Sequence, residues 1–241
     1  MTETVTSRDD HSEHVSYEDK PIRIFPIEEV FLDKIRPHEE VNEPDLRSFC
    51  RSFREKGLFY KPILIDRESG TILDGTHRWA GLKDLGAEKA PVIPFRYQDN
   101  DEIEVLTWFP FCEQPLDEIL SLFDHHDISY EAIEHDQFQT QPVSEPIVYT
   151  ADSAYQILHD PIPLFHLLEE AIDFQYTDHR KNLNQFVDNG AVGFLRNPPT
   201  KETVVEVTRN NKSVPPKYTC HRFPYKYPHI MARYQDLVPN G

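Results

Sequence analysis

The segment 72–86 contains the residues of this chain that are best suited to bind phosphate. An apolar run ends there in a turn, and a helix is expected to follow at once. The turn and helix start read Asp74, Gly75, Thr76, His77 and Arg78. The first N–H groups of a helix lack intrahelical partners and the helix dipole is positive at this end, so a helix start favours anions. His77 and Arg78 would add side-chain donors. The plainer alternative is that Asp74 and Thr76 only cap the helix while Arg78 faces water.

Asp74 is also the predicted metal-binding carboxylate of this segment. Mg²⁺ prefers oxygen ligands and keeps several waters, so one carboxylate can hold it directly or through water. Alternatively, Asp74 orients a neighbouring side chain. Other metal patterns are missing from the sequence, because the twelve histidines form no HExxH and the three cysteines form no CxxC.

The elements around this segment are expected to form a compact α+β unit. Strands are predicted at 22–32, 61–66, 71–74 and 91–97, and helices at 42–56 and 76–85. The first helix should begin at Asn42 or Pro44 and end at Gly57, because apolar residues between them recur at spacings of three and four. The second half is predicted to hold strands at 104–109, 147–149 and 192–196, and helices at 116–123, 164–174, 178–187 and 201–210.

Composition argues for a globular protein and against a nucleic-acid partner. Hydrophobic residues make up 38% of the 241 residues, and 42 acidic against 25 basic residues give a net charge of −17. Such a field repels a phosphate backbone. No apolar run approaches the ~20 residues of a membrane helix. Residues 1–20 lack the basic start and apolar centre of a signal peptide and are expected to form a flexible tail, so a cytoplasmic protein without a membrane partner is predicted.

Four segments together resemble the SerK-type free serine kinases of the ParB/sulfiredoxin-like superfamily. Residues 74–86, DGTHRWAGLKDLG, resemble the superfamily signature DG-x-HR-x-x-x-L-x-x-LG. Residues 34–40 (KIRPHEE), 105–110 (VLTWFP) and 215–221 (PPKYTCH) resemble the K-x-x-PHE loop, the T-W-aromatic-P strand and the PK-x-T-x-H segment of the kinases. The resemblance runs from about residue 22 to 237, and the combination is more specific than any one segment.

The resemblance implies that Glu39, the glutamate after Pro-His, is the general base. It would take the proton from the serine hydroxyl as that oxygen attacks the terminal phosphoryl group, a role that typically contributes about 10²–10⁴-fold to the rate. Glu40 is a rival, because a local shift of register would exchange the two. The plainer alternative for either is a solvated loop carboxylate.

The resemblance also implies a set of substrate-binding residues: Ser52, Trp108, Lys217, Thr219 and His221. Thr219 and His221 would donate to the oxygens of phosphoserine, Trp108 would wall the pocket, and Lys217 would add a positive charge. From spacing alone, Trp108 would be assigned to the core and Ser52 to the surface of the first helix.

The chain departs from the family pattern at two positions. Thr76 stands where many relatives carry a histidine, and Cys220 stands where a basic residue is common, so the choice between ADP and ATP stays open. Three other functions remain: a ParB-like DNA-binding or nuclease protein, a sulfiredoxin, and a non-catalytic sensor of serine or nucleotide. The first should carry more arginines and a helix-turn-helix domain, and the second a cysteine in place of Thr76. The sensor would bind without turnover.

The sequence therefore predicts an α+β protein with a ParB/sulfiredoxin-like nucleotide-binding domain at 21–135 and a smaller α/β lobe at 136–241. The active site should lie between the two. The predicted reaction converts free L-serine to O-phospho-L-serine with Mg²⁺ and with ADP or ATP, and the product would enter cysteine synthesis.

Overall fold

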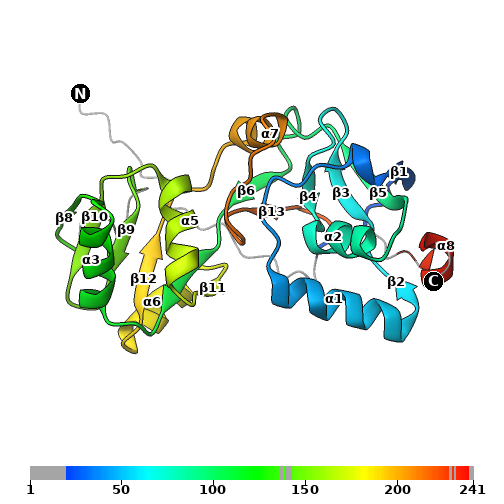
Figure 1. Ribbon diagram of the computed structural model, residues 1–241. Coiled ribbons are helices and arrows are strands. Elements are labelled where there is room, and N and C mark those ends of the chain that lie inside the picture. The colour runs from blue at the N-terminus through cyan, green and yellow to red at the C-terminus, as the bar shows by residue number, and fades with distance from the viewer. Residues whose placement is uncertain (1–19, 136–137, 139–142, 228–229, 231, 239–241) are drawn as a thin grey trace, which may run out of the picture.

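The computed structural model describes residues 20–135, 138, 143–227, 230 and 232–238. Figure 1 shows two lobes, each built around a β-sheet, with thin connections between them. The tail expected at 1–20 lies outside the described residues except for Lys20. In the described part of the chain, no helix is long and apolar enough to cross a membrane.

The first lobe contains a four-stranded sheet in the order β1-β5-β3-β4. Its strands are β1 (Glu28–Phe31), β5 (Lys89–Phe95), β3 (Ile63–Asp66) and β4 (Ile72–Asp74). Strands β3 and β5 run parallel, whereas β1–β5 and β3–β4 are antiparallel. Successive side chains of a strand point to opposite faces, so Ile63 and Ile65 enter one core and Leu64 enters another.

Helices cover both faces of this sheet. On the Ile63 face lie α1 (Glu43–Lys56) and α2 (Thr76–Asp84), which contribute Phe53 and Leu82 to the core. On the other face lies α7 (Lys201–Arg209), which contributes Val204 and Val205 although it comes from much later in the chain. After the second lobe, the chain therefore returns to the first lobe at α7.

Local sequence explains where α1 begins and ends. The side chain of Asn42 accepts a hydrogen bond from the N–H of Asp45, and Pro44 lies in the first turn, where its missing N–H costs nothing. Gly57 ends the helix at φ 64°, a left-handed conformation that glycine adopts without steric cost. Both ends agree with the sequence prediction.

The second lobe contains a six-stranded sheet in the order β11-β7-β12-β9-β10-β8, and all the pairs recorded for it are antiparallel. Its strands are β7 (Phe109–Cys112), β8 (Tyr130–Ala132), β9 (Ile147–Tyr149), β10 (Ala154–Ile157), β11 (Gln175–Thr177) and β12 (Val192–Leu195). Helices α3 (Leu116–His125) and α5 (Pro161–Ala171) pack on one face, and α6 (Arg180–Asp188) packs on the other.

One pair of short strands lies between the lobes, and a second pair belongs to the first lobe. Strand β6 (Glu104–Leu106) pairs with β13 (Cys220–Arg222), and β2 (Leu58–Phe59) pairs with β14 (Ala232–Arg233). The remaining short elements are η2 (Leu32–Lys34) and α8 (Tyr234–Leu237). In Figure 1, β6 and β13 lie between the two sheets.

The α+β class is confirmed, and the prediction of one strand over 104–109 is wrong in detail. The chain forms β6 and β7 with Thr107 and Trp108 between them in no strand. Each strand joins a different sheet, which requires a break at this point. We propose that the lobes divide here rather than after residue 135, because β7 and α3 pack within the second lobe.

Candidate active site

The loop that carries Glu39 is held in place by a distant segment. The N–H of Glu40 donates to the carbonyl of Val214 at 2.9 Å, and the N–H of Val214 donates to the carbonyl of His38 at 2.8 Å. This bridge brings Glu39 beside the segment that follows Val214. The N–H of Thr219 donates to Oε1 of Glu39 at 3.3 Å. Two segments that resemble the kinase pattern are thus in direct contact.

The surroundings of Glu39 raise its pKa. Burial raises the pKa of this carboxyl to about 7, although the backbone N–H groups of Thr219 and Tyr218 and the charges of Arg196 and Lys217 lower it. A carboxyl with a pKa near neutrality can both accept and release a proton at physiological pH. This is the property that a general base requires.

Glu40 lies in a different environment from its neighbour. Its Oε1 accepts a hydrogen bond from Ser213 Oγ at 2.9 Å and lies 3.6 Å from Nδ1 of His166. These contacts direct Glu40 toward α5, whereas Glu39 is directed toward Thr219. The two glutamates therefore do not share one position.

The buried His38 and the half-buried His221 form a pair beside Thr219. Their rings lie edge to face with centroids 5.8 Å apart. His38 Nε2 lies 2.8 Å from Thr219 Oγ1, and His221 Nε2 lies 2.7 Å from Tyr97 Oη. Burial lowers the pKa of His38 to about 4 and that of His221 to about 3, so both rings are neutral at pH 7.

The predicted phosphate site lies at the start of α2. Gly75 precedes the helix at φ 113°, and the first helical hydrogen bond runs from Trp79 N to the Gly75 carbonyl at 2.9 Å. The N–H groups of residues 76–78 therefore have no partner within the helix. A Cβ at Gly75 would lie 2.8 Å from Nη2 of Arg78, so the guanidinium folds over the glycine. Thr76 is buried.

Asp74 and Arg78 form an ion pair rather than a helix cap. Arg78 Nη2 lies 2.9 Å from Asp74 Oδ2, and Tyr227 donates to the same oxygen at 2.8 Å. Burial would raise the pKa of Asp74, but Arg78 and Tyr227 outweigh it and hold the pKa below its usual value. The alternative in which Asp74 caps the helix and Arg78 faces water is therefore wrong.

Asp74 is compatible with a Mg²⁺ held mainly by phosphate. Among the described residues, no group of three His, Cys, Asp or Glu side chains could hold a metal. A protein site built wholly from side chains is thus absent from that part of the chain. Mg²⁺ in kinases is bound by one or two carboxylates plus substrate oxygens. Arg78 and Tyr227 both contact Oδ2 of Asp74.

Asp45, which sequence reasoning did not select, contacts two of the predicted site residues. Its Oδ2 lies 3.3 Å from Lys217 Nζ and 3.9 Å from His77 Nε2, while the N–H of Asn42 donates to His77 Nε2 at 3.1 Å. Lys217 Nζ also lies 5.6 Å from the centre of the Trp108 ring. Asp45 therefore connects the helix start, the lysine and the tryptophan.

Arg196 is the second residue that sequence reasoning missed. It directly follows β12, is only 2% exposed, and hydrogen-bonds to the carbonyls of both Trp108 and Lys217. An arginine after the apolar run VGFL resembles any residue that leaves a strand for solvent, so the sequence carries no signal of its burial.

Ser52 stands apart from the other predicted residues. It is half-buried on α1, seven residues after Asp45, or about 10 Å along the helix axis. No contact between Ser52 and another predicted site residue is recorded in the described chain. Its role as a phosphate contact stays a prediction.

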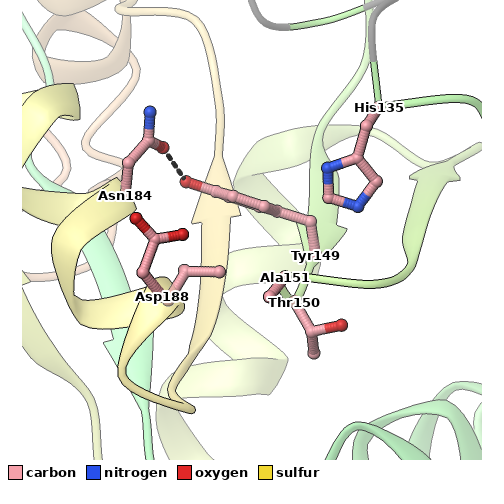
Figure 2. A pocket seen from close by; sticks show the side chains of 7 residues that line it. His135, Tyr149, Thr150, Ala151, Asn184 and Asp188 are labelled. Atoms are coloured by element: carbon pink, nitrogen blue, oxygen red, sulfur yellow. Dashed lines mark hydrogen bonds between the residues drawn. The ribbon is translucent and has the colours of Figure 1, made fainter.

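A separate pocket of about 250 Å³ lies in the second lobe. Figure 2 shows the Tyr149 hydroxyl donating to Asn184 at 2.7 Å, with Asp188 and His135 nearby. The residues that line it come from β9, its following turn, α6 and residue 135. None of the predicted site residues lines this pocket.

Comparisons with known proteins agree with the resemblance in the sequence. No family model matches the chain. A protein named ADP-dependent L-serine kinase SerK, from Thermococcus kodakarensis, is 28% identical over 222 residues, which cover 86% of this chain and 90% of the relative. A protein named ATP-dependent L-serine kinase, from Staphylothermus marinus, is 26% identical and covers 85% and 90%.

Solved structures point the same way. A free serine kinase in complex with AMP has a TM-score of 0.78 and 26% identity over 91% of this chain and 96% of that chain. The chain is a homologue of the free serine kinases. A variant of a free serine kinase with one glutamate replaced by glutamine, also with AMP, has a TM-score of 0.79 at 25% identity, covering 91% and 97%. SbnI from Staphylococcus aureus, at 16% identity, a TM-score of 0.74 and coverage of 89% and 90%, shares the fold.

Proposed function

We propose that this protein transfers a phosphoryl group from a nucleotide to the hydroxyl of free L-serine and so forms O-phospho-L-serine. One observation carries the proposal: Glu39, with its pKa raised to about 7, accepts a hydrogen bond from Thr219 on the segment that also carries Lys217. The charge of Lys217 acts on both Glu39 and His77 at the start of α2. The base and the helix start thus border one shared region.

Glu39 is the general base of the proposed reaction. It takes the serine hydroxyl proton as the oxygen attacks the terminal phosphoryl group. Its hydrogen bond from Thr219 supports Glu39 over Glu40, whose carboxyl accepts from Ser213 and lies 3.6 Å from His166. A glutamate has been replaced in solved free serine kinases, and this choice of variant is consistent with a glutamate of functional interest.

The start of α2 holds the transferring phosphoryl group. Its charge is spread over equatorial oxygens during transfer, and fixed donors that meet those oxygens stabilise the transition state. The N–H groups of 76–78 and the side chains of His77 and Arg78 supply such donors. Asp74 would hold a Mg²⁺ that accompanies the nucleotide, and the ion would supply charge neutralisation at the phosphates.

Thr219 and His221 differ in whether their hydrogen-bond donors are available to bind phosphoserine. When His38 carries its proton on Nε2, it donates to Thr219 Oγ1 and leaves the threonine hydroxyl hydrogen available for a phosphate oxygen. Nε2 of His221 is already bonded to Tyr97, and the ring also has a hydrogen bond with the Leu73 backbone, so a phosphate contact from this ring would have to replace one of the two. Lys217 lies against Trp108, so the lysine charge and the aromatic wall form one surface.

The donor nucleotide, the compartment and the use of the product follow from the chemistry of the reactants. Named relatives use ADP or ATP, and either nucleotide presents a terminal phosphoryl group to the same helix start. ADP and ATP are abundant in the cytoplasm, which is where the reaction would take place. The product carries a better leaving group than serine, so an enzyme of cysteine synthesis would consume it.

Phosphorus NMR tests the function directly. Purified protein is incubated with L-serine, Mg²⁺ and either ADP or ATP, with D-serine and no amino acid as controls. The expected result is a phosphomonoester signal that coincides with added O-phospho-L-serine, together with AMP from ADP or ADP from ATP. Nucleotide binding without this signal would mean a sensor. Absence of both, with salt-sensitive binding of duplex DNA, would mean a ParB-like DNA-binding protein.

A further inference from the structure

Arg196 is a buried charge with no ion-pair partner among the described residues. Only 2% of its surface is exposed. Removing a guanidinium from water costs several kcal/mol unless hydrogen bonds and nearby charges compensate for the lost hydration. An apolar residue of similar volume would pack there without the penalty, so the interactions of the guanidinium group are the ones to examine for a role.

The guanidinium group of Arg196 joins three segments of the chain. It lies 4.3 Å from the ring centres of both Phe165 and Tyr218. Its Nε donates to Thr107 Oγ1 at 3.0 Å, and that hydroxyl donates to the Tyr218 carbonyl at 2.9 Å. Its Nη2 donates to the carbonyls of Lys217 at 2.9 Å and of Trp108 at 3.3 Å. The bonds therefore end on the backbones that carry the predicted substrate-binding side chains.

The backbone of Lys217 needs such support. It has a φ of 59°, a left-handed conformation that is uncommon for residues with a Cβ. Conformations of this kind persist only where their surroundings hold them. The hydrogen bond from Arg196 to the Lys217 carbonyl supplies one restraint at this residue, so the direction of the lysine side chain depends on the arginine.

The charge of Arg196 also acts on the base. Glu39 faces the backbone N–H groups of Thr219 and Tyr218 and the positive charges of Arg196 and Lys217, and it lies within electrostatic reach of Tyr176 and Cys220. Glu169 contributes a second negative charge near the arginine. Of these groups, Arg196 is the one fixed positive charge that is fully buried, so water screens it least.

We propose that Arg196 is a positioning residue of the kinase site, which holds the Trp108 and Lys217 backbones in register and whose buried positive charge favours the ionised form of Glu39. The proposal rests on the proposed function. It goes beyond the motif residues, because Arg196 belongs to the second lobe and lies in none of the four segments that resemble the kinases. The fork geometry and the charge are separate contributions, and two substitutions separate them.

Arg196→Lys keeps the charge and loses the planar fork, whereas Arg196→Met loses both. For Arg196→Lys, we expect the KM for L-serine to rise about 10- to 100-fold, as for the loss of one charge-assisted hydrogen bond, with the acid limb of kcat/KM near its original pH. For Arg196→Met, we expect the acid limb to move up by about one pH unit or more as well. Arg180→Met is the matched control, because Arg180 also donates to a backbone carbonyl but lies in α6.

A ¹³C NMR titration of the Glu39 carboxyl measures its pKa directly, and so detects the effect of the Arg196 charge on Glu39 without turnover. This keeps the test independent of activity. If wild-type protein phosphorylates serine but Arg196→Lys folds and keeps its KM for L-serine, the positioning role is overturned while the proposed function stands. If Arg196→Met does not fold, Arg196→Lys and the titration still decide. An unchanged Glu39 titration in a folded Arg196→Met protein overturns the charge role.

Discussion

The pH dependence of serine phosphorylation should reveal Glu39. With a pKa of about 7, roughly nine-tenths of the carboxyl is ionised at pH 8 and roughly one-tenth at pH 6. Only the ionised form accepts the serine proton, so kcat/KM should fall about tenfold between these pH values. An ordinary glutamate, with a pKa near 4.5, would stay ionised throughout and give no change.

The assay is kcat/KM for L-serine measured from pH 5.5 to 9 at saturating nucleotide. The parameter kcat/KM for L-serine reports the groups of the nucleotide-bound enzyme before serine binds. Glu40→Gln is the matched control and should keep the limb, because Glu40 is bonded to Ser213 and His166 instead. A flat profile from pH 8 to 5.5 would refute the reasoning, as would a limb that persists in the residual activity of Glu39→Gln.

Three further predictions concern the scaffold. Gly75→Ala should weaken nucleotide binding about 10- to 100-fold in a titration, because the new Cβ would displace Arg78 and strain a residue at φ 113°; unchanged affinity would contradict this. Gly81→Ala should lower the free energy of unfolding in urea by ~1–2 kcal/mol, since its Cβ would lie 2.4 Å from the Phe49 ring and overpacking exceeds the ~1 kcal/mol gained in helix propensity; a stabilised variant would contradict it. The pair of His38 and His221 should make the free energy of unfolding fall by about 0.8 kcal/mol between pH 6.5 and 5.5, because two histidines gain protons on unfolding (about 2 kcal/mol) while Glu39 acts in the opposite direction (about 1.2 kcal/mol); a rise over this range in urea unfolding would contradict it.

Local signals in the sequence were sufficient for the helix start at α2. The turn, the glycine and the polar residues that follow are neighbours in sequence, so their spacing places them in space without reference to the rest of the fold. The structure keeps them together at the end of β4. It adds the ion pair between Asp74 and Arg78, whose four-residue separation on a helix start would have allowed it to be foreseen.

The separation of Glu39 from Glu40 could not be predicted from the sequence. Neighbouring residues of one loop have the same local pattern, and the difference arises from the pairing of that loop with Val214. This contact joins residues more than 170 positions apart, as the separation of 173 between Ser213 and Glu40 illustrates. The raised pKa of Glu39 depends on the same contact.

Asp45 and Arg196 were missed for a related reason. Each is a charged residue in a position where solvent exposure is the ordinary expectation, one in the first turn of a helix and one at the end of a strand. Asp45 gains its role from Lys217, and Arg196 gains its role from Trp108 and Lys217. The break between β6 and β7 is also a tertiary effect, since it appears only when the two strands join different sheets.

The most direct test of the kinase site is a comparison of Glu39→Gln with Glu40→Gln in single-turnover phosphorylation of L-serine, with nucleotide affinity measured in parallel. The account predicts that Glu39→Gln binds nucleotide normally and turns over at least about a hundredfold more slowly, while Glu40→Gln stays within a few-fold of wild type. Undiminished turnover in Glu39→Gln, or a larger loss in Glu40→Gln, would contradict it.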